Sequence, residues 1–346
     1  MILTRGARVT GAVLCAVLAL IVAGWLVRDI RAADDIGALW RYWAGYYDAR
    51  LPMLPATSAY DLVLLVVYLL AFVAALRSSA AAAVLVATGV VTIVLRLPGL
   101  WNIGESRMDT RFTDDLRTRA LLCAFVALAA GIALIITAGA GRRRARDFSE
   151  CLPARPGQGA GVVAFLLLGA AGVVVIAWEI RQAVRIPEIY PDWFVGGDRV
   201  MQGLIDPPPG WFSAVLMLLC LFAGVSGLPR AVHARPFGLV AAALLLFGGV
   251  LGVVRAVHYE LLDRFGDLHV EDQLIVLTGF FEVIAGAVVL LVLARPGPQE
   301  PPAPPDQGYG QGYGPGYGQG YGQGYGHPQP GAFGPPPPPS QPPPGW

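Results

Sequence analysis

The stretch ALLCAFVALAAGIALIITA, residues 120–138, decides the fold, because Thr137 is its only polar side chain. A helix needs about 20 apolar residues to cross the hydrocarbon core of a bilayer. Seven further stretches have this character. The eight predicted spans are residues 9–27, 62–76, 80–95, 120–138, 160–178, 212–228, 237–257 and 273–294. The sequence therefore predicts an all-α polytopic membrane protein with eight transmembrane helices.

The composition agrees with this fold class. Only 14% of the 346 residues are charged and 55% are hydrophobic, with a mean hydropathy of +0.57, whereas soluble domains contain about 25% charged residues. The net charge of +1 gives no basic footprint for nucleic acid. All 25 basic residues are arginine, which favours a high-GC source such as an actinobacterium. The four cysteines form no C-x-x-C pair, and we predict no metal site and no cofactor.

The arginines give the predicted orientation. A compact cluster at 142–146 follows the fourth span, and Arg5 and Arg8 precede the first on the same side. The opposite loops carry more arginines in total, but they are much longer and rich in acidic residues. Because the positive-inside rule counts short loops, we predict a plasma-membrane protein with both termini cytoplasmic. Residues 9–27 are interpreted as a span because their apolar run exceeds the 7–15 residues of a signal-peptide core.

The chain shows signs of an internal duplication. Residues 1–138 and 160–295 each contain four spans with the same order of long, short and medium loops, joined by a basic linker at 139–159. Trp25 with Arg28 corresponds to Trp178 with Arg181, and Arg96 and Arg255 close the third span of each half. Four spans is an even number, so the sequence predicts two parallel four-helix repeats.

The C-terminal tail, residues 296–346, has a different composition. Seventeen of these residues are proline and 14 are glycine, and tyrosine recurs every fourth residue from Tyr309 to Tyr325. Such a segment buries too little apolar surface to repay the entropy of ordering, and we predict that it is disordered. It resembles Gly-Tyr-Gln-Pro tails of actinobacterial membrane proteins. Two interpretations stay open: a tail that binds protein partners, and a tail that only solubilises the chain.

The outer loops and one span supply the candidate site residues. Residues 34–50 have an apolar, aromatic face that predicts a helix in the membrane interface, and Leu261–Leu268 predicts a second one. Glu282 lies near the middle of the last span, with Arg255 as the nearest basic candidate. An ionisable group there favours a proton or cation site, and the alternative is a neutral carboxylic acid hydrogen-bonded to its neighbours. The last outer loop adds a polar cluster: His258, Glu260, Asp263, Asp267 and His269.

That polar cluster could ligate a divalent cation, but its spacing matches no ligand pattern, so a solvated acidic loop is the preferred interpretation. A separate candidate is Asp192, which is followed by Gly203 and by prolines at 207–209. This stretch of about 20 residues resembles the first outer loop of polyprenyl-phosphate-dependent glycosyltransferases of the C type. The resemblance implies that Asp192 would be a catalytic base, although those enzymes have more spans.

Three function classes follow from these features. The first is a bacterial envelope protein that binds or scaffolds through its outer loops and tail, with the lipid bilayer and proteins as partners. The second is a secondary transporter with a site between the repeats. The third is a membrane glycosyltransferase that uses Asp192. The sequence favours a protein without enzymatic activity.

Overall fold

The computed structural model describes residues 2–33, 35–46, 51, 53–143, 155–200, 202–295 and 297. Within these residues, eight helices are long and apolar enough to cross a membrane, which confirms the predicted all-α polytopic fold. The protein is therefore a multi-pass membrane protein. The tail at 296–346, apart from Gly297, and most of the linker at 139–159 lie outside the described residues.

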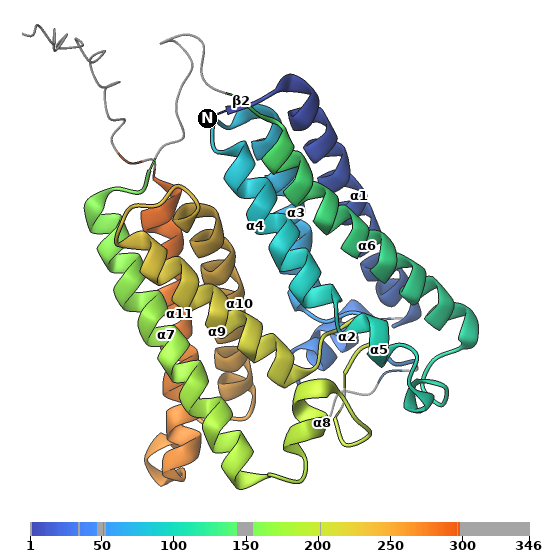
Figure 1. Ribbon diagram of the computed structural model, residues 1–346. Helices are drawn as coiled ribbons and strands as arrows, with labels where there is room; N and C mark the ends of the chain where they lie inside the picture. Colours follow the sequence, from blue (N-terminus) through green and yellow to red (C-terminus); the bar gives the residue numbers. More distant parts are fainter. Residues whose placement is uncertain are drawn as a thin grey trace, which may run out of the picture. The chain divides into compact units, whose positions relative to one another are not determined.

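The first half contains four long helices, α1 (Arg5–Ala32), α3 (Tyr60–Arg77), α4 (Ala81–Arg96) and α6 (Asp114–Ala140). Between them lie α2 (Ile36–Trp43), α5 (Gly99–Asn102) and a 3-10 turn at Ser106–Met108. The long helices pack in a ring in the order α1, α3, α4, α6. Figure 1 shows this half in blue to green.

The second half contains four long helices that also pack in a ring, in the order α7 (Gln158–Arg185), α9 (Pro209–Gly227), α10 (Ala234–His258) and α11 (Val270–Ala294). The short helix α8 (Tyr190–Val195) follows α7, and a 3-10 turn at Phe265–Asp267 precedes α11. Helices α3 and α4 of the first half contact α9 and α10 of the second. The two four-helix rings are visible side by side in Figure 1.

Two short strands close the first half at one end of the molecule. Strand β1 (Ile2–Leu3) pairs antiparallel with β2 (Arg142–Arg143), which follows α6 directly. The backbone N–H of Thr4 donates to the carbonyl of Gly141, and the Thr4 hydroxyl then caps α1 by accepting from Ala7. The start of the chain therefore lies at the same end as Arg142 and Arg143 after α6 (Figure 1).

Of the two predicted interface helices, one is shorter in the structure and the other is not formed. Helix α2 covers Ile36–Trp43 instead of 34–50, and its Leu39 is fully buried. Asp35 caps the start of α2, because its carboxylate accepts hydrogen bonds from the backbone N–H groups of Gly37 and Ala38. In the last outer loop the prediction of a helix over Leu261–Leu268 was wrong: the chain forms turns and the 3-10 segment Phe265–Asp267. The region carries too many exposed polar residues for one continuous buried face.

Candidate functional site: a polar cluster between the two halves

The outer loop of the first half reaches the second half. The Tyr46 ring stacks on His258 at the end of α10, with ring centroids 3.8 Å apart and planes 4° from parallel. Gly45 precedes it with a φ of +76°, a left-handed conformation that glycine adopts without strain. Trp40, Trp43 and Tyr46 pack with Leu251 of α10 in one apolar cluster. These aromatic residues thus join the two halves.

The corresponding loop of the second half reaches the first in the same way. The Trp101 indole N–H donates to the carbonyl of Val195 (2.9 Å), and the backbone N–H of Ile205 donates to that of Ala56 (3.0 Å). Leu204 is fully buried in an apolar cluster with Met108 and other residues of the first half. Each half therefore contributes a loop that packs on the other half, at the end of the molecule opposite β1 and β2.

A buried ion pair lies where these loops cross. Asp61, at the start of α3, accepts from Arg96 at the end of α4, with Nη2 and Oδ1 2.5 Å apart. Both side chains are more than nine-tenths buried. The Nη1 atom of Arg96 donates to the carbonyl of Ile205 (2.9 Å), which belongs to the second half. Arg96 thus connects Asp61 to the incoming loop, and its charge is compensated inside the protein.

Asp206 stands next to this pair, at the end of the loop from the second half. Its carboxylate accepts hydrogen bonds from the Ser58 side chain and from the backbone N–H of Gly203. Burial raises the pKa of Asp206 well above the usual range, and the charge of Asp61 raises it further, while Arg96 acts in the opposite direction. A carboxyl in this position holds a proton at pH values where an exposed aspartate has lost it.

A third carboxylate completes the polar cluster. Asp29, near the end of α1, is 1% exposed and pairs with Arg28 at 2.5 Å. Its Oδ2 accepts from both the backbone N–H (2.7 Å) and the hydroxyl (2.6 Å) of Thr57. Burial raises the pKa of Tyr42, and the charges of Asp206 and Asp29 add to the rise. The Tyr42 hydroxyl therefore belongs to the same electrostatic environment. We call Asp29, Asp61, Arg96 and Asp206 the interhalf cluster.

Glu282 also lies at the boundary between the halves. It is the thirteenth of 25 residues in α11, so it sits at the middle of that helix. A Cβ atom added to Gly248 would lie 2.9 Å from the Tyr60 hydroxyl and 3.7 Å from Glu282 Oε2, so both oxygens converge on this glycine. Tyr60 comes from α3 of the first half, next to Asp61, and its ring packs on Phe212 at 4.3 Å between centroids. The carboxyl at the middle of α11 thus approaches a phenol of the first half.

Arg255 is close enough to Glu282 for their charges to interact. The arginine is exposed, and its guanidinium lies 3.5 Å from the point where a side chain on Gly45 would begin. Arg255 therefore approaches the loop of the first half, as Arg96 approaches the loop of the second.

The outer-loop residues predicted from sequence do not come together as a ligand set. His258 is stacked on Tyr46, and Glu260 occupies a left-handed turn with a φ of +52°. Asp263, Asp267 and His269 are exposed on the connection to α11. Among the described residues, no group of three or more His, Cys, Asp or Glu side chains is placed to hold a metal ion.

Asp192 lies in α8, where it is half-buried beside Gly197. Its charge acts on Arg107, a buried arginine whose pKa burial lowers. The groups that act on Asp206 are different ones, Asp61, Ser58, Arg96 and Gly203. Asp192 therefore acts on Arg107, whereas the largest effects on Asp206 come from its burial and from Asp61.

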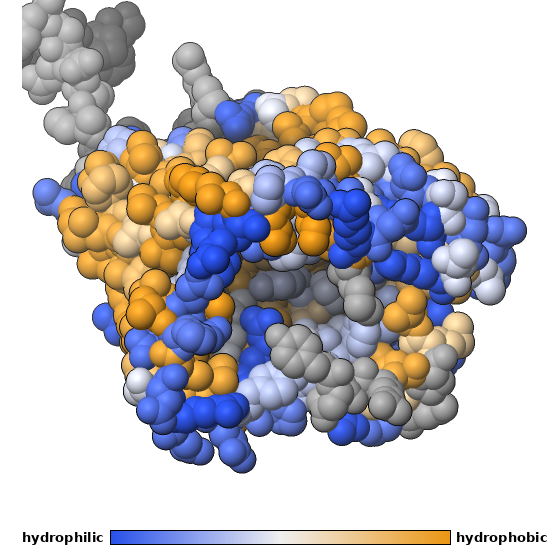
Figure 2. Space-filling view, turned by 90° about the horizontal axis from the view of Figure 1, so that it is seen from below, coloured by the Kyte–Doolittle hydropathy of each residue, from blue (hydrophilic) through white to orange (hydrophobic). Residues whose placement is uncertain are grey.

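The end of the molecule opposite β1 and β2 is hollowed. Figure 2 views it from the end at which α8 and the α10–α11 connection lie, and shows a depression near the centre with hydrophilic residues around it. Comparison with known proteins found no matching family model, no similar curated protein and no similar solved structure. The inference of function therefore rests on the site itself.

Proposed function

We propose that this protein is a proton-translocating membrane protein of the secondary-transporter class, with its site between the two halves. The observation that carries the proposal is the meeting of Asp206 from the second half with the Asp61–Arg96 pair from the first. Buried ionisable groups inside a helical membrane protein mark ion and proton paths, because each is costly to keep there.

The chemistry of the interhalf cluster suits a proton. Asp206 has a raised pKa, and its charged form would place a second carboxylate next to Asp61. Proton uptake by Asp206 relieves that repulsion, and proton release restores it. Tyr60 directly precedes Asp61 in the sequence, and its hydroxyl converges with Glu282 on Gly248. A proton that enters at Asp206 therefore has further polar groups along the boundary between the halves.

The proposal includes an internal duplication of the chain. We infer that the halves are two parallel repeats, and three features support it. Their helix rings have the same order, their outer loops cross, and Arg96 and Arg255 each approach the other half's loop. Transporters built from repeats place their sites at the repeat interface. We further propose the orientation in which the end with β1 and β2 is cytoplasmic, so that the interhalf cluster opens to the outside.

The two other function classes receive less support from the geometry. The aromatic residues Trp43, Tyr46 and Trp101 are engaged between the halves, which leaves them less available for the expected scaffolding role. The tail, which would bind partners, lies outside the described residues. The glycosyltransferase alternative depends on Asp192, which lies apart from the groups that act on Asp206.

Proton uptake by proteoliposomes tests the proposal. The full chain is reconstituted with a trapped pH-sensitive dye, and a potassium diffusion potential, negative inside, drives protons inward. We expect faster acidification than in protein-free liposomes, and a loss of about tenfold or more in Glu282→Gln and in Asp206→Asn, typical of removing a proton-transfer group. Asp263→Asn, which removes an exposed outer-loop carboxylate, should keep the wild-type rate. Uptake no faster than in empty liposomes, or full activity in both site variants, would show that the proposal is wrong.

A further inference from the structure

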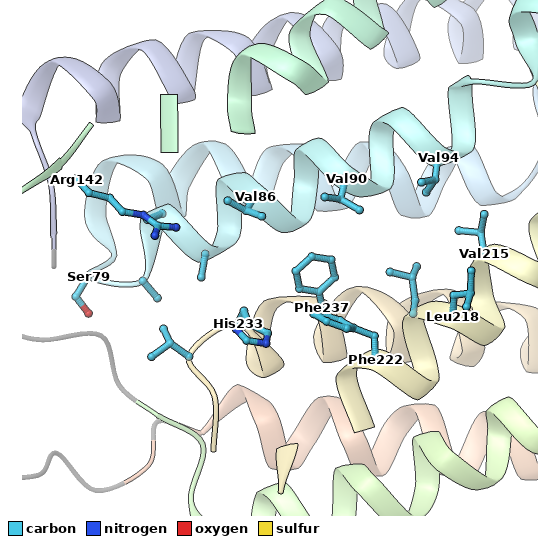
Figure 3. Close-up of a pocket in the computed structure, with 15 residues that line it drawn as sticks. Ser79, Val86, Val90, Val94, Arg142, Val215, Leu218, Phe222, His233 and Phe237 are labelled. Atoms are coloured by element: carbon cyan, nitrogen blue, oxygen red, sulfur yellow. The ribbon is translucent and has the colours of Figure 1, made fainter. Parts of the chain in front are cut away.

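A second site lies between the halves and runs along α4, from Ser79 at the end that carries β1 and β2 to Val94. It is a cleft of about 860 Å³ bounded by α4 on one side and by α9 and the start of α10 on the other. Figure 3 shows Val86, Val90 and Val94 of α4 facing Leu218, Phe222 and Phe237 across it. None of the interhalf cluster residues lines this cleft.

The walls of the cleft are apolar over most of its length. From Ala80 to Val94, the lining side of α4 covers 14 residue steps, or about 21 Å at 1.5 Å per residue. One leaflet of the hydrocarbon core is about 15 Å thick, half of the full 30 Å. The apolar wall from Ala82 to Val94 and from Val215 to Phe222 belongs to two candidate membrane spans, and Leu218 and Phe222 of this wall are 60% and 47% exposed. The cleft is therefore longer than one leaflet is thick, so it has room for one extended acyl chain along its apolar walls.

One end of the cleft is polar and basic. Arg142, His233 and Ser79 line it there, and Figure 3 shows them at the end opposite Val94 and Val215. Arg142 follows α6 and is exposed, and its Nε donates to the carbonyl of Ala138 (3.1 Å). The His233 ring lies against Phe222, with centroids 5.3 Å apart, and its Nε2 is 3.3 Å from the Ser226 hydroxyl. A cationic end on an apolar trough complements an anionic amphiphile.

We propose that this cleft binds an anionic phospholipid, with one acyl chain along α4 and the phosphate against Arg142 and His233. A cleft among membrane-spanning helices is in contact with lipid, and its apolar walls favour a hydrocarbon chain over water. A basic pocket between transmembrane helices at the arginine-rich end attracts an anionic headgroup, worth about 1 kcal/mol for each basic residue near the surface. The site is separate from the proposed proton path, and either proposal can fail without the other.

Native mass spectrometry of the full chain in mild detergent tests the lipid site. The protein is mixed with equal amounts of phosphatidylglycerol and phosphatidylcholine of the same chain length. We expect bound phosphatidylglycerol to exceed bound phosphatidylcholine, and Arg142→Gln to reduce that preference about fivefold, the factor for one basic residue at an anionic lipid surface. Val86→Trp should reduce the binding of both lipids, because the indole fills the trough.

Two matched variants serve as controls. Arg77→Gln removes an exposed arginine at the end of α3 that lies on the same side of the molecule as Arg142. Leu69→Trp adds an indole to α3 at a position that is 50% exposed and lies outside the cleft. Both should bind lipid as the wild type does. Equal binding of the two lipids by the wild type, or an Arg142→Gln variant that keeps the full preference, would overturn the proposal. Displacement of phosphatidylglycerol by inorganic phosphate alone would identify a free-anion site and also overturn it. Arg142 is exposed, so its variant remains informative even if Val86→Trp fails to fold.

Discussion

Arg96→Met should lower the free energy of unfolding by about 3–5 kcal/mol, the cost of leaving a buried charge without its partner. Asp61 would remain 2% exposed without its guanidinium, and the Ile205 carbonyl would lose the donor that ties the two halves together. The measurement is unfolding of the full chain in mixed detergent micelles, followed by circular dichroism.

The control for Arg96 is Arg119→Met. Arg119 also pairs with an aspartate, Asp115 at 2.8 Å, but both side chains are about two-thirds exposed. Exposed pairs contribute about 0–1 kcal/mol, so this variant should be nearly as stable as the wild type. The double variant Arg96→Met/Asp61→Leu should regain most of the loss, since no unpaired charge remains. Equal effects of Arg96→Met and Arg119→Met would show that the interhalf ion pair does not stabilise the assembly.

Gly249→Leu should also lower the free energy of unfolding, by less than Arg96→Met does. A Cβ at Gly249 would lie 2.7 Å from the backbone nitrogen of Val283 and 2.8 Å from both the Glu282 Cβ and the Gly279 carbonyl oxygen. Two of these three atoms are backbone of α11, so α10 and α11 would have to separate. Overpacking of this kind costs about 1–3 kcal/mol. Because Glu282 is one of the displaced residues, proton uptake should fall together with stability.

The matched control is Gly169→Leu in α7. A Cβ there meets no heavy atom within 4 Å, so the leucine has room at the surface of the helix. Its unfolding in mixed micelles and its proton uptake should match those of the wild type. A Gly249→Leu variant as stable as Gly169→Leu would contradict the close packing of α10 on α11.

The spans could be predicted from the sequence because the length and polarity of each apolar run are local properties. Glu282 could be singled out for the same reason, since a charged residue in the middle of an apolar run is visible without tertiary information. Asp61 and Arg96 were not predicted as site residues. Each lies at the end of a span, where charged residues are common, and only the fold shows that both ends are covered by protein.

Asp206 was not predicted either, because its loop has the sequence of a polar, proline-rich connection. The environment of Asp206 forms where the loops of the two halves cross. Residues 203–206 pack on the first half next to Arg96, although they follow Arg96 by more than 100 positions in the sequence. The pairing of such distant segments depends on tertiary contacts that no local pattern encodes. The repeated arginines Arg96 and Arg255 were the one signal in the sequence that pointed towards this boundary.

Infrared titration of the full chain in lipid tests the central claim, that Asp206 holds a proton between the halves. An exposed aspartate loses its proton near a pKa of about 3.9. Burial and Asp61 raise the pKa of Asp206, so its neutral form persists as the pH rises above that value. The account predicts a protonated-carboxyl band that survives well above the ordinary aspartate range and is missing in Asp206→Asn. Identical titrations of the wild type and Asp206→Asn would contradict it.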